Sequence, residues 1–282
     1  MILTLPVSEF LYSVSKTLGP YIFDVNVDSY DDLVSLLSQK GIIRGKIENE
    51  EMLEREVRRF YISLIKKLTD YSLVWKNYHK IANLIYYYVS IEDFEYIISC
   101  IKNGIKINRN LIVNSELQKL SDVSSIQELK DSLKGTVFSE ALDFSQSAPS
   151  IEELRTNLHL YFIYKIKKFK SNILNKILCP YYDYIALIYA LRYKKALDIA
   201  CTFTKQQLED LIEDVIQKNV NELAEIKSNA LRKIKNDVKY LFEIQGPQSP
   251  LSFISALILL TMTMMEITNK IYELKLKKRV IS

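Results

Sequence analysis

Glycine and proline are scarce in this sequence. Six of each occur in 282 residues, whereas folds with many tight turns need more of both. We therefore expect long helices joined by few connections, and no alternating run of residues is long enough to predict a sheet. With 48% hydrophobic and 26% charged residues, the chain has the composition of a folded globular protein that buries a substantial core.

Cysteine and histidine are also few. Cys100, Cys179 and Cys201 are an odd number at wide spacing, which predicts neither a disulfide framework nor a CxxC site and indicates a reducing cytoplasm. His79 and His159 each stand alone among aromatic and lysine residues. Because no His, Cys or carboxylate cluster has ligand spacing, we expect two partly buried helix residues and no metal cofactor.

The usual catalytic and targeting motifs are missing as well. "GIIRGK" (Gly41 to Lys46) has three residues between its glycines and Ile47 after the lysine, whereas a phosphate loop needs four and then Ser or Thr. Glu152 and Glu153 open a helical pattern, where acids stabilise the helix dipole. The opening "MILTLPVSEF" lacks the basic region and long apolar core of a signal peptide. We expect no catalytic site, cofactor or small-molecule substrate.

Charge is mild overall but unevenly distributed. The net charge of +4 is too small to indicate a nucleic-acid partner. Residues 1–150 carry 17 basic and 20 acidic residues, whereas 151–282 carry 21 and 14. Much of the excess lies in "KLKKR", which contains Lys275, Lys277, Lys278 and Arg279. This run is either a solvated helix end that suits the dipole or a basic rim that faces an acidic partner or an anionic membrane.

One apolar stretch, Leu251 to Met265, resembles a membrane span. It is 15 residues long, contains four hydroxyl residues and is followed directly by Glu266. A spanning helix needs about 20 apolar residues. A buried core helix is the better interpretation.

Apolar residues recur at helical spacing along almost the whole chain. Ser29 or Asp31 is a candidate cap of the first helix, and Gly104 is a candidate C-terminal glycine. Residues 105–124 are expected to form a loop with short turns, and 246–250 a break. The expected helices cover 30–41, 49–72, 78–104, 125–136, 149–170, 179–200, 204–219, 222–245 and the region after 250.

The order of these segments repeats. Phe60–Leu68, "FYISLIKKL", aligns without a gap with Tyr161–Phe169, "YFIYKIKKF". Three aromatic or apolar helices also share a pattern that begins with an acid and carries a basic residue nine positions later. The pairs are Asp93 with Lys102, Asp183 with Arg192, and Glu266 with Lys275. Repetition in the same order predicts three related helical units, over 1–104, 105–200 and 201–282.

Helical geometry predicts where these acids lie relative to the apolar face of each helix. At about 100° per residue, positions 1, 4, 5 and 8 after the acid form one apolar stripe, and the acid and the later base lie on its two flanks. Such an acid is either a structural group, solvated or hydrogen-bonded to a neighbouring helix end, or an ionisable functional group. The structural interpretation is favoured.

The last helix carries a resemblance to a known family. "PLSFISALILLTMTMMEITNKIYELKLKKR", with Glu266, Ile267 and Asn269 in place, is similar to the end of the C/d-type central-stalk subunit of archaeal A-type and bacterial V/A-type ATP synthases, a family that also includes its V-ATPase counterpart. Tyr96 and Ala186 stand where the earlier copies of that family's motif have Asn. The resemblance covers the order of elements along the whole chain and is strongest over 250–279.

The resemblance implies an all-α fold of three similar helical units around a pseudo-threefold axis, forming a funnel. It implies a non-catalytic rotor subunit on the cytoplasmic face of the membrane, between the central shaft and the proteolipid ring. The alternatives are a helical scaffold or adaptor without enzymatic activity and, behind it, an all-helical enzyme or membrane protein.

Overall fold

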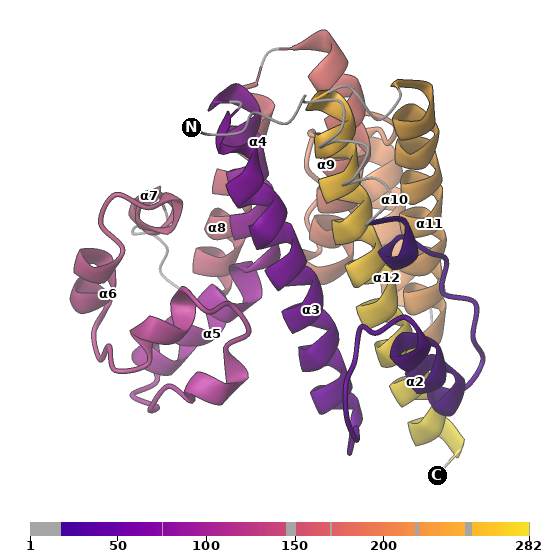
Figure 1. Ribbon diagram of the computed structural model, residues 1–282, viewed down its shortest axis with the longest axis horizontal. Helices are drawn as coiled ribbons and strands as arrows, with labels where there is room; N and C mark the ends of the chain where they lie inside the picture. The colour runs from indigo at the N-terminus through magenta and orange to yellow at the C-terminus, as the bar shows by residue number, and fades with distance from the viewer. Residues whose placement is uncertain are drawn as a thin grey trace, which may run out of the picture. The chain divides into compact units, whose positions relative to one another are not determined.

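A computed structural model describes residues 18–74, 76–144, 151–169, 171–217, 220–245 and 250–281. Within these ranges the chain forms helices and loops without a strand, which confirms the all-α prediction (Figure 1). The chain divides into two compact units. Unit 1 comprises Met1–Tyr61 and Lys170–Ser282, and unit 2 comprises Ile62–Phe169. The three consecutive units inferred from the repeats stay a prediction.

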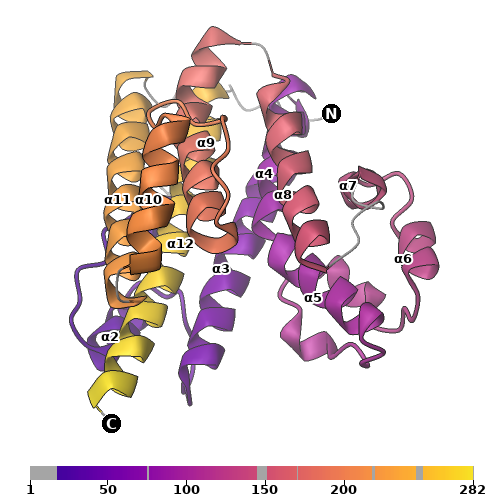
Figure 2. The same ribbon diagram turned by 180° about the vertical axis from the view of Figure 1, so that it is seen from behind.

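Unit 1 is built around three long helices. Its elements are a short 3-10 helix (Gly19–Tyr21), α2 (Tyr30–Gln39), the first half of α3 (Glu50–Tyr71), α9 (Asn172–Tyr193), α10 (Lys205–Gln217), α11 (Val220–Gln245) and α12 (Pro250–Ile281). α11 and α12 pack against each other and α9 packs against both, while α10 lies on α9 (Figure 2). The core of unit 1 therefore lies where α9, α11 and α12 meet.

Helix α12 supplies much of this core. It is long and apolar enough to cross a membrane by length and composition, but 83% of its most apolar stretch is buried within the protein. It is also 32 residues long, so the apolar run of 15 is only part of one helix. Two of its buried hydroxyl groups bond to the helix itself, since Thr261 and Thr263 donate to the carbonyls of Leu257 and Leu259 at 2.8 and 2.9 Å. This arrangement matches the expected core helix.

Unit 2 has an aromatic core. Its elements are the second half of α3, α4 (Lys76–Val89), α5 (Ile91–Lys102), α6 (Ile126–Ser132), α7 (Val137–Phe144), α8 (Ile151–Lys167) and 3-10 helices at Ser72–Val74, Arg109–Leu111 and Leu117–Leu120. α8 packs against α4, α5 and α7. Phe138 lies at the centre, with its ring centroid 4.5 Å from that of Phe94 and 6.1 Å from that of Phe162. Such tilted and edge-on pairs stabilise beyond their buried area.

Local sequence signals explain several helix ends. Ser29 caps α2, because its hydroxyl accepts the N–H of Asp32 at 3.1 Å, and Gly104 after α5 has the positive φ of 62° that a C-terminal glycine permits. Ser171 caps α9 in the same way through the N–H of Leu174, so that helix begins seven residues earlier than predicted and continues through Pro180. It ends at Tyr193, before the left-handed Lys194.

In unit 2, one predicted helix is divided in two and one observed helix was not predicted. The segment 78–104 was expected to form one helix, but Ser90 separates α4 from α5. Its hydroxyl donates to the carbonyl of Tyr86 at 3.0 Å, and such back-bonding competes with the helical ladder. Helix α7 was not predicted. Thr136 caps it through the N–H of Ser139 at 3.3 Å, and Phe138, Ala141 and Leu142 are buried.

Candidate functional site

The histidines do not form a reactive cluster. In unit 2, Nδ1 of His79 lies 2.9 Å from Ser72 Oγ and 3.1 Å from the carbonyl of Thr69. His159 on α8 is fully buried, and its Nε2 lies 3.0 Å from the Glu95 carboxylate on α5. Among the described residues, no group of three or more His, Cys, Asp or Glu side chains lies close enough to hold a metal ion. The most distinctive polar geometry lies instead at the three repeated acids.

Asp93 lies in the first turn of α5 in unit 2 and is 2% exposed. Its Oδ2 accepts the backbone N–H groups of Val113 and Asn114 at 2.9 and 2.6 Å. The Asn114 side chain then donates to Ser90 Oγ at 2.7 Å, three residues before the acid. One buried carboxylate and one side-chain hydrogen bond therefore hold the segment after α5 against its helix.

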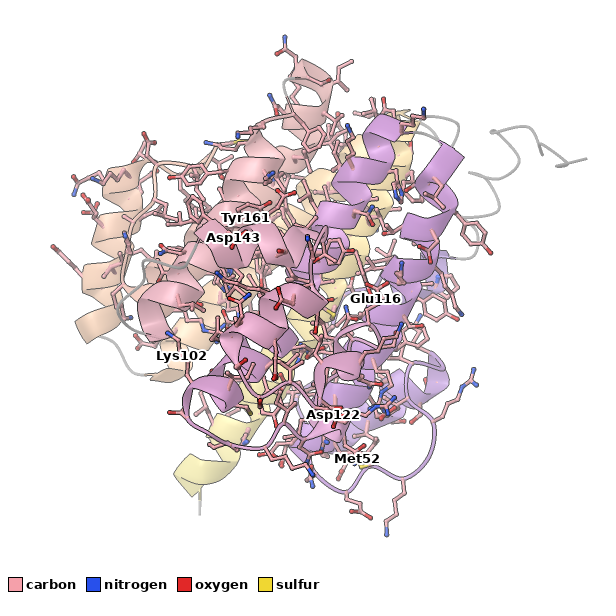
Figure 3. All side chains as sticks on the ribbon, turned by 90° about the vertical axis from the view of Figure 1, so that its left-hand side faces the viewer. Met52, Lys102, Glu116, Asp122, Asp143 and Tyr161 are labelled. Atoms are coloured by element: carbon pink, nitrogen blue, oxygen red, sulfur yellow. A yellow bond between two sulfur atoms is a disulfide. The ribbon has the colours of Figure 1, made fainter. Side chains whose placement is uncertain are left out.

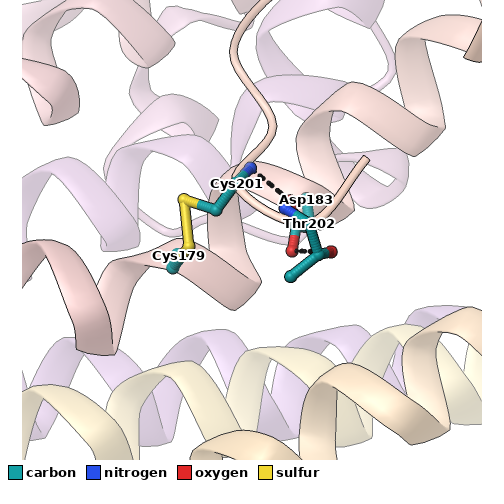
Figure 4. The surroundings of a disulfide bond; sticks show 4 residues. All are labelled: Cys179, Asp183, Cys201 and Thr202. Atoms are coloured by element: carbon teal, nitrogen blue, oxygen red, sulfur yellow. Dashed lines mark hydrogen bonds between the residues drawn. A yellow bond between two sulfur atoms is a disulfide. The ribbon is translucent and has the colours of Figure 1, made fainter. Parts of the chain in front are cut away.

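Asp183 holds a segment in the same way in unit 1. It lies in the middle of α9 and is 2% exposed. Its Oδ1 accepts the N–H groups of Cys201 and Thr202 at 2.6 and 3.0 Å, and the Thr202 hydroxyl donates to its other oxygen (Figure 4). Here the second bond to the helix is a disulfide between Cys179, four residues before the acid, and Cys201.

Glu266 in α12 is the third copy. It is 2% exposed, and its Oε1 accepts the N–H of Val25 at 3.3 Å, across 241 residues of sequence. Its second oxygen bonds to the ammonium of Lys235 on α11. Lys235 also donates to Asp24 at 2.7 Å and to the carbonyl of Phe23 at 2.8 Å. The ammonium thus has three oxygen partners, and its bond to Asp24 lowers the pKa of that carboxyl.

These three contacts share one chemistry, which we call the carboxylate clamp. A buried acid on a helix accepts the backbone N–H of one or two residues in an irregular segment. The donors follow the acid by 20 and 21 residues at Asp93 and by 18 and 19 at Asp183. Backbone N–H groups and a buried carboxylate satisfy one another, so neither is left unpaired. The clamp joins helix and segment; it places no reactive group in a pocket.

The structure corrects the expected surroundings of the acids. Sequence geometry put Asp93, Asp183 and Glu266 on the flank of an apolar stripe, but all three are fully buried. The flank is covered because a segment distant in sequence lies over it and supplies N–H donors. The stripe itself is largely as predicted: Phe94, Ile97 and Ile98 after Asp93 are buried.

The repeated basic residues lie apart from the clamps. Lys102 and Arg192 are exposed in the last turns of α5 and α9, and Lys102 is labelled in Figure 3. Lys275 is half-buried, with Nζ 3.8 Å from Glu51. Asn269 is buried and donates to Glu273 at 3.0 Å. Lys277 is exposed, and the side chains of Lys278 and Arg279 lie outside the described residues.

The disulfide overturns the expectation for cysteine. No bridge was predicted from three widely spaced cysteines, yet Cys179 and Cys201 are joined, with Cα atoms 5.6 Å apart. The clamp explains the pairing, because Asp183 fixes the backbone of Cys201 one helical turn from Cys179. Cys100 in unit 2 is buried and forms no disulfide. Sequence spacing alone gave no sign of this bridge, since it depends on the fold of the segment 194–204.

Sequence reasoning also missed the partners of the acids. Lys235 reads as one of several bases on α11, yet its side chain is 3% exposed. A basic residue whose helical phase places it on the apolar face, between Leu231, Ile234 and Val238, is the signal that could have found it. Asn114 and Val25 carry no comparable signal, because they act through the position of a loop.

Two open cavities lie elsewhere. In unit 1 a polar groove of about 400 Å³ is lined by Glu222, Glu225, Ser228, Asn229, Arg232, Lys270, Glu273 and Lys277. Its three acids and three bases balance, so the lining favours no strongly charged ligand. In unit 2 a cavity of about 350 Å³ lies at the end of α5, beside Cys100 and Gly104. Neither cavity contains one of the clamp acids.

Comparison of the sequence and the structure with known proteins found no matching family model, no matching curated protein and no matching solved structure.

Proposed function

We propose that this chain is a non-catalytic central-stalk subunit of an A/V-type rotary ATP synthase. It connects the central shaft to the membrane proteolipid ring and transmits torque during ion-coupled synthesis or hydrolysis of ATP. In this role it lies peripherally on the cytoplasmic face of the membrane and needs no cofactor, nucleic acid or small-molecule substrate. Its work is mechanical, so it requires stiff helices and broad contact surfaces rather than a nucleophile.

The recurrence of the carboxylate clamp is the observation that carries this proposal. Asp93, Asp183 and Glu266 occupy corresponding places in the sequence repeat, and each holds an irregular segment to its helix. The third acid takes its N–H donor from residue 25, near the start of the series of elements, and not from a later residue. Such a contact is expected if three units follow one another around an axis, because the last unit then meets the first. The funnel of the family that this chain resembles has this arrangement.

Buried hydrogen-bonded charges also suit a part that carries torque. Each clamp fixes the path of a loop with charge-assisted hydrogen bonds, which are shorter and stronger than neutral ones. Opening a clamp would leave its buried carboxylate without these hydrogen-bond donors, and this raises the free-energy cost of deformation. These clamps therefore limit the relative movement of helix and loop when force is applied.

The basic end of α12 is the proposed contact with the ring or with lipid head groups. Lys277 is exposed there and Lys275 is half-buried. Rim charges of this kind chiefly affect association rate and its salt dependence. We expect the triple change of Lys275, Lys277 and Lys278 to Glu to weaken ring binding. Reversal of Lys176, Lys205 and Lys233, which are exposed in unit 1, is the matched control.

Affinity purification of the tagged full chain from native membranes tests the proposal. The expected result is co-purification of shaft, proteolipid and catalytic-head subunits, reduced by the α12 reversals and unchanged by the control reversals. Recovery of the chain alone from a membrane extract in which the intact synthase is recovered by another subunit would overturn it.

A helical scaffold or adaptor without enzymatic activity is the second candidate. It requires no closed ring of three units and is compatible with the division of the chain into two compact units. The two candidates differ in closure: a rotor subunit needs three clamp helices related by rotations of about 120° around one axis, whereas a scaffold stacks its units in an open array. An experimental structure of the full chain distinguishes them.

A further inference from the structure

The segment Lys194–Thr204 is held to α9 by two chemically different bonds at one point. Cys201 supplies its N–H to Asp183 and its sulfur to Cys179. In Figure 4 both bonds converge on this residue from the same helix. Cys201 is an exposed residue and Cys179 is half-buried, so Cys201 is the cysteine of the pair that lies nearer to solvent.

The corresponding bond in unit 2 is not covalent. There Asn114 donates its N–H to Asp93 and its side-chain amide to Ser90. Asn114 and Ser90 are both fully buried. The same connection between segment and helix is thus made by a buried hydrogen bond in one copy and, in the other, by a disulfide to an exposed residue. A covalent bond is not a requirement of the clamp.

We propose that Cys179–Cys201 is a thiol–disulfide exchange site, through which a dithiol reductant loosens the segment Lys194–Thr204 from α9. This goes beyond the proposed function and does not depend on it. The partner is a protein or small molecule that presents two thiols able to form a disulfide between themselves.

The exchange balances in two steps. A thiolate of the partner attacks Sγ of Cys201, the bond to Cys179 breaks, and Cys179 leaves as a thiolate that takes a proton from water. The partner's second thiolate then attacks the partner's sulfur of the mixed disulfide, and Cys201 leaves as a thiolate that also takes a proton from water. The partner is oxidised to a disulfide, and the chain is reduced to two thiols.

Asp183 gives this exchange its reversibility. When the disulfide is open, the carboxylate still accepts the N–H groups of Cys201 and Thr202 and the Thr202 hydroxyl. It therefore keeps the two thiols at high effective concentration, which favours re-formation of the bridge. Asp183 is a positioning residue here, because it touches neither sulfur in the exchange.

Reduction should loosen only this segment. Most of its residues are exposed, with Ile199 as its buried anchor, so few apolar contacts oppose local opening. Amide hydrogen exchange of the full chain, oxidised and then reduced with dithiothreitol, should show segment 196–204 exchanging about tenfold faster. Segment 105–114 of unit 2 should be unchanged. Equal exchange in the two redox states would overturn the proposal.

Trapping identifies the attacked sulfur. A thioredoxin-type dithiol protein whose resolving cysteine is replaced by serine should form a mixed disulfide with Cys201, located by peptide mass mapping. Cys100→Ser, which alters no disulfide, should trap equally well. A mixed disulfide on Cys179, or none under conditions in which dithiothreitol reduces the bridge, would contradict the assigned route.

Re-formation tests the role of Asp183. In a glutathione buffer, Asp183→Ala should slow closure of the disulfide by about tenfold, whereas Asp93→Asn in unit 2 should leave the rate unchanged. Equal closure rates for wild type and Asp183→Ala would remove the positioning role. If Asp183→Ala does not fold, Thr202→Val, which deletes one hydroxyl donor to the carboxylate, gives the same comparison with a smaller expected effect.

Discussion

The clamps at Asp93 and Asp183 perform the same local task in different surroundings. At Asp93 the donors Val113 and Asn114 are buried, and the second bond is a buried hydrogen bond. At Asp183 the donors Cys201 and Thr202 are exposed, and the second bond is a disulfide. Where burial excludes water, hydrogen bonds alone hold the segment. Where water reaches the donors, a covalent bond supplements the carboxylate. The comparison predicts how each clamp fails.

The clamp at Glu266 should be the most sensitive, because it contains a buried ion pair. Lys235→Met leaves the Glu266 carboxylate buried without its cation, which should cost about 4 kcal/mol of unfolding free energy. Urea unfolding followed by circular dichroism measures it. Lys233→Met, exposed on the same helix, should cost less than about 0.5 kcal/mol. The double change Lys235→Met with Glu266→Met should regain much of the loss; equal losses for the two lysine variants would contradict the ion-pair account.

Removing the unit 2 clamp should have the next largest effect. Asp93→Ala leaves the buried N–H groups of Val113 and Asn114 without an acceptor, at about 1–3 kcal/mol for each group. We expect the free energy of unfolding to fall by about 3 kcal/mol, measured in urea. Asp122→Ala, at an exposed position of the same unit, is the control. A loss no larger than that of the control would show that Asp93 does not hold the segment.

The unit 1 clamp should tolerate the same change better. In the oxidised protein, Asp183→Ala exposes donors that water can satisfy and leaves the disulfide intact, so we expect a loss of about 1 kcal/mol. After reduction the loss should grow, because the carboxylate is then the principal remaining bond to the segment. The comparison is made by urea unfolding with and without dithiothreitol. A loss equal to that of Asp93→Ala in the oxidised protein would remove the distinction between the two clamps.

The pH dependence of stability should be a smaller effect with a defined sign. The bond from Lys235 lowers the pKa of Asp24 in unit 1, and bonds from Lys165 and Tyr161 lower the pKa of Glu140 in unit 2. A carboxyl whose pKa is lower in the folded state stabilises the fold above its unfolded pKa, near 4, and loses that contribution as pH falls through the folded value. Thermal midpoints should therefore drop below about pH 4.

Matched variants assign this acid sensitivity to each unit. Asp24→Asn should flatten the pH dependence of stability by removing the unit 1 contribution, and Glu140→Gln by removing the unit 2 contribution. Thermal midpoints of wild type and both variants across this pH range measure the effect. An unchanged slope in both variants would show that other carboxyl groups carry it.

Much of the fold could be read from the sequence, because helical periodicity and caps are local signals. The division into two units could not be predicted. The segments before and after Ile62–Phe169 are distant in sequence but form one unit together. The break at Ser90 and helix α7 were missed because each depends on one hydroxyl group and on neighbouring aromatic residues. Periodicity records which face is apolar, not which segment later covers it.

The candidate site was predicted in part. The repeat identified Asp93, Asp183 and Glu266 as corresponding residues, and all three form the same kind of contact. Their burial could not be predicted, because helical periodicity gives no information on which distant segment covers the flank of a helix. Lys235 and the Cys179–Cys201 bridge were missed for the same reason: both depend on pairs of residues that only the folded chain brings together.

Amide hydrogen exchange at the donors of the three clamps tests whether the buried carboxylates hold these segments. We expect slow exchange at Val113, Asn114 and Val25, intermediate exchange at Cys201 and Thr202, and faster exchange at each when its own acid is changed to alanine. Exposed Ser115 provides the reference for an unprotected position beside a clamp. Exchange of the five donors at the rate of Ser115 in the wild-type protein would contradict the claim that buried carboxylates hold these segments.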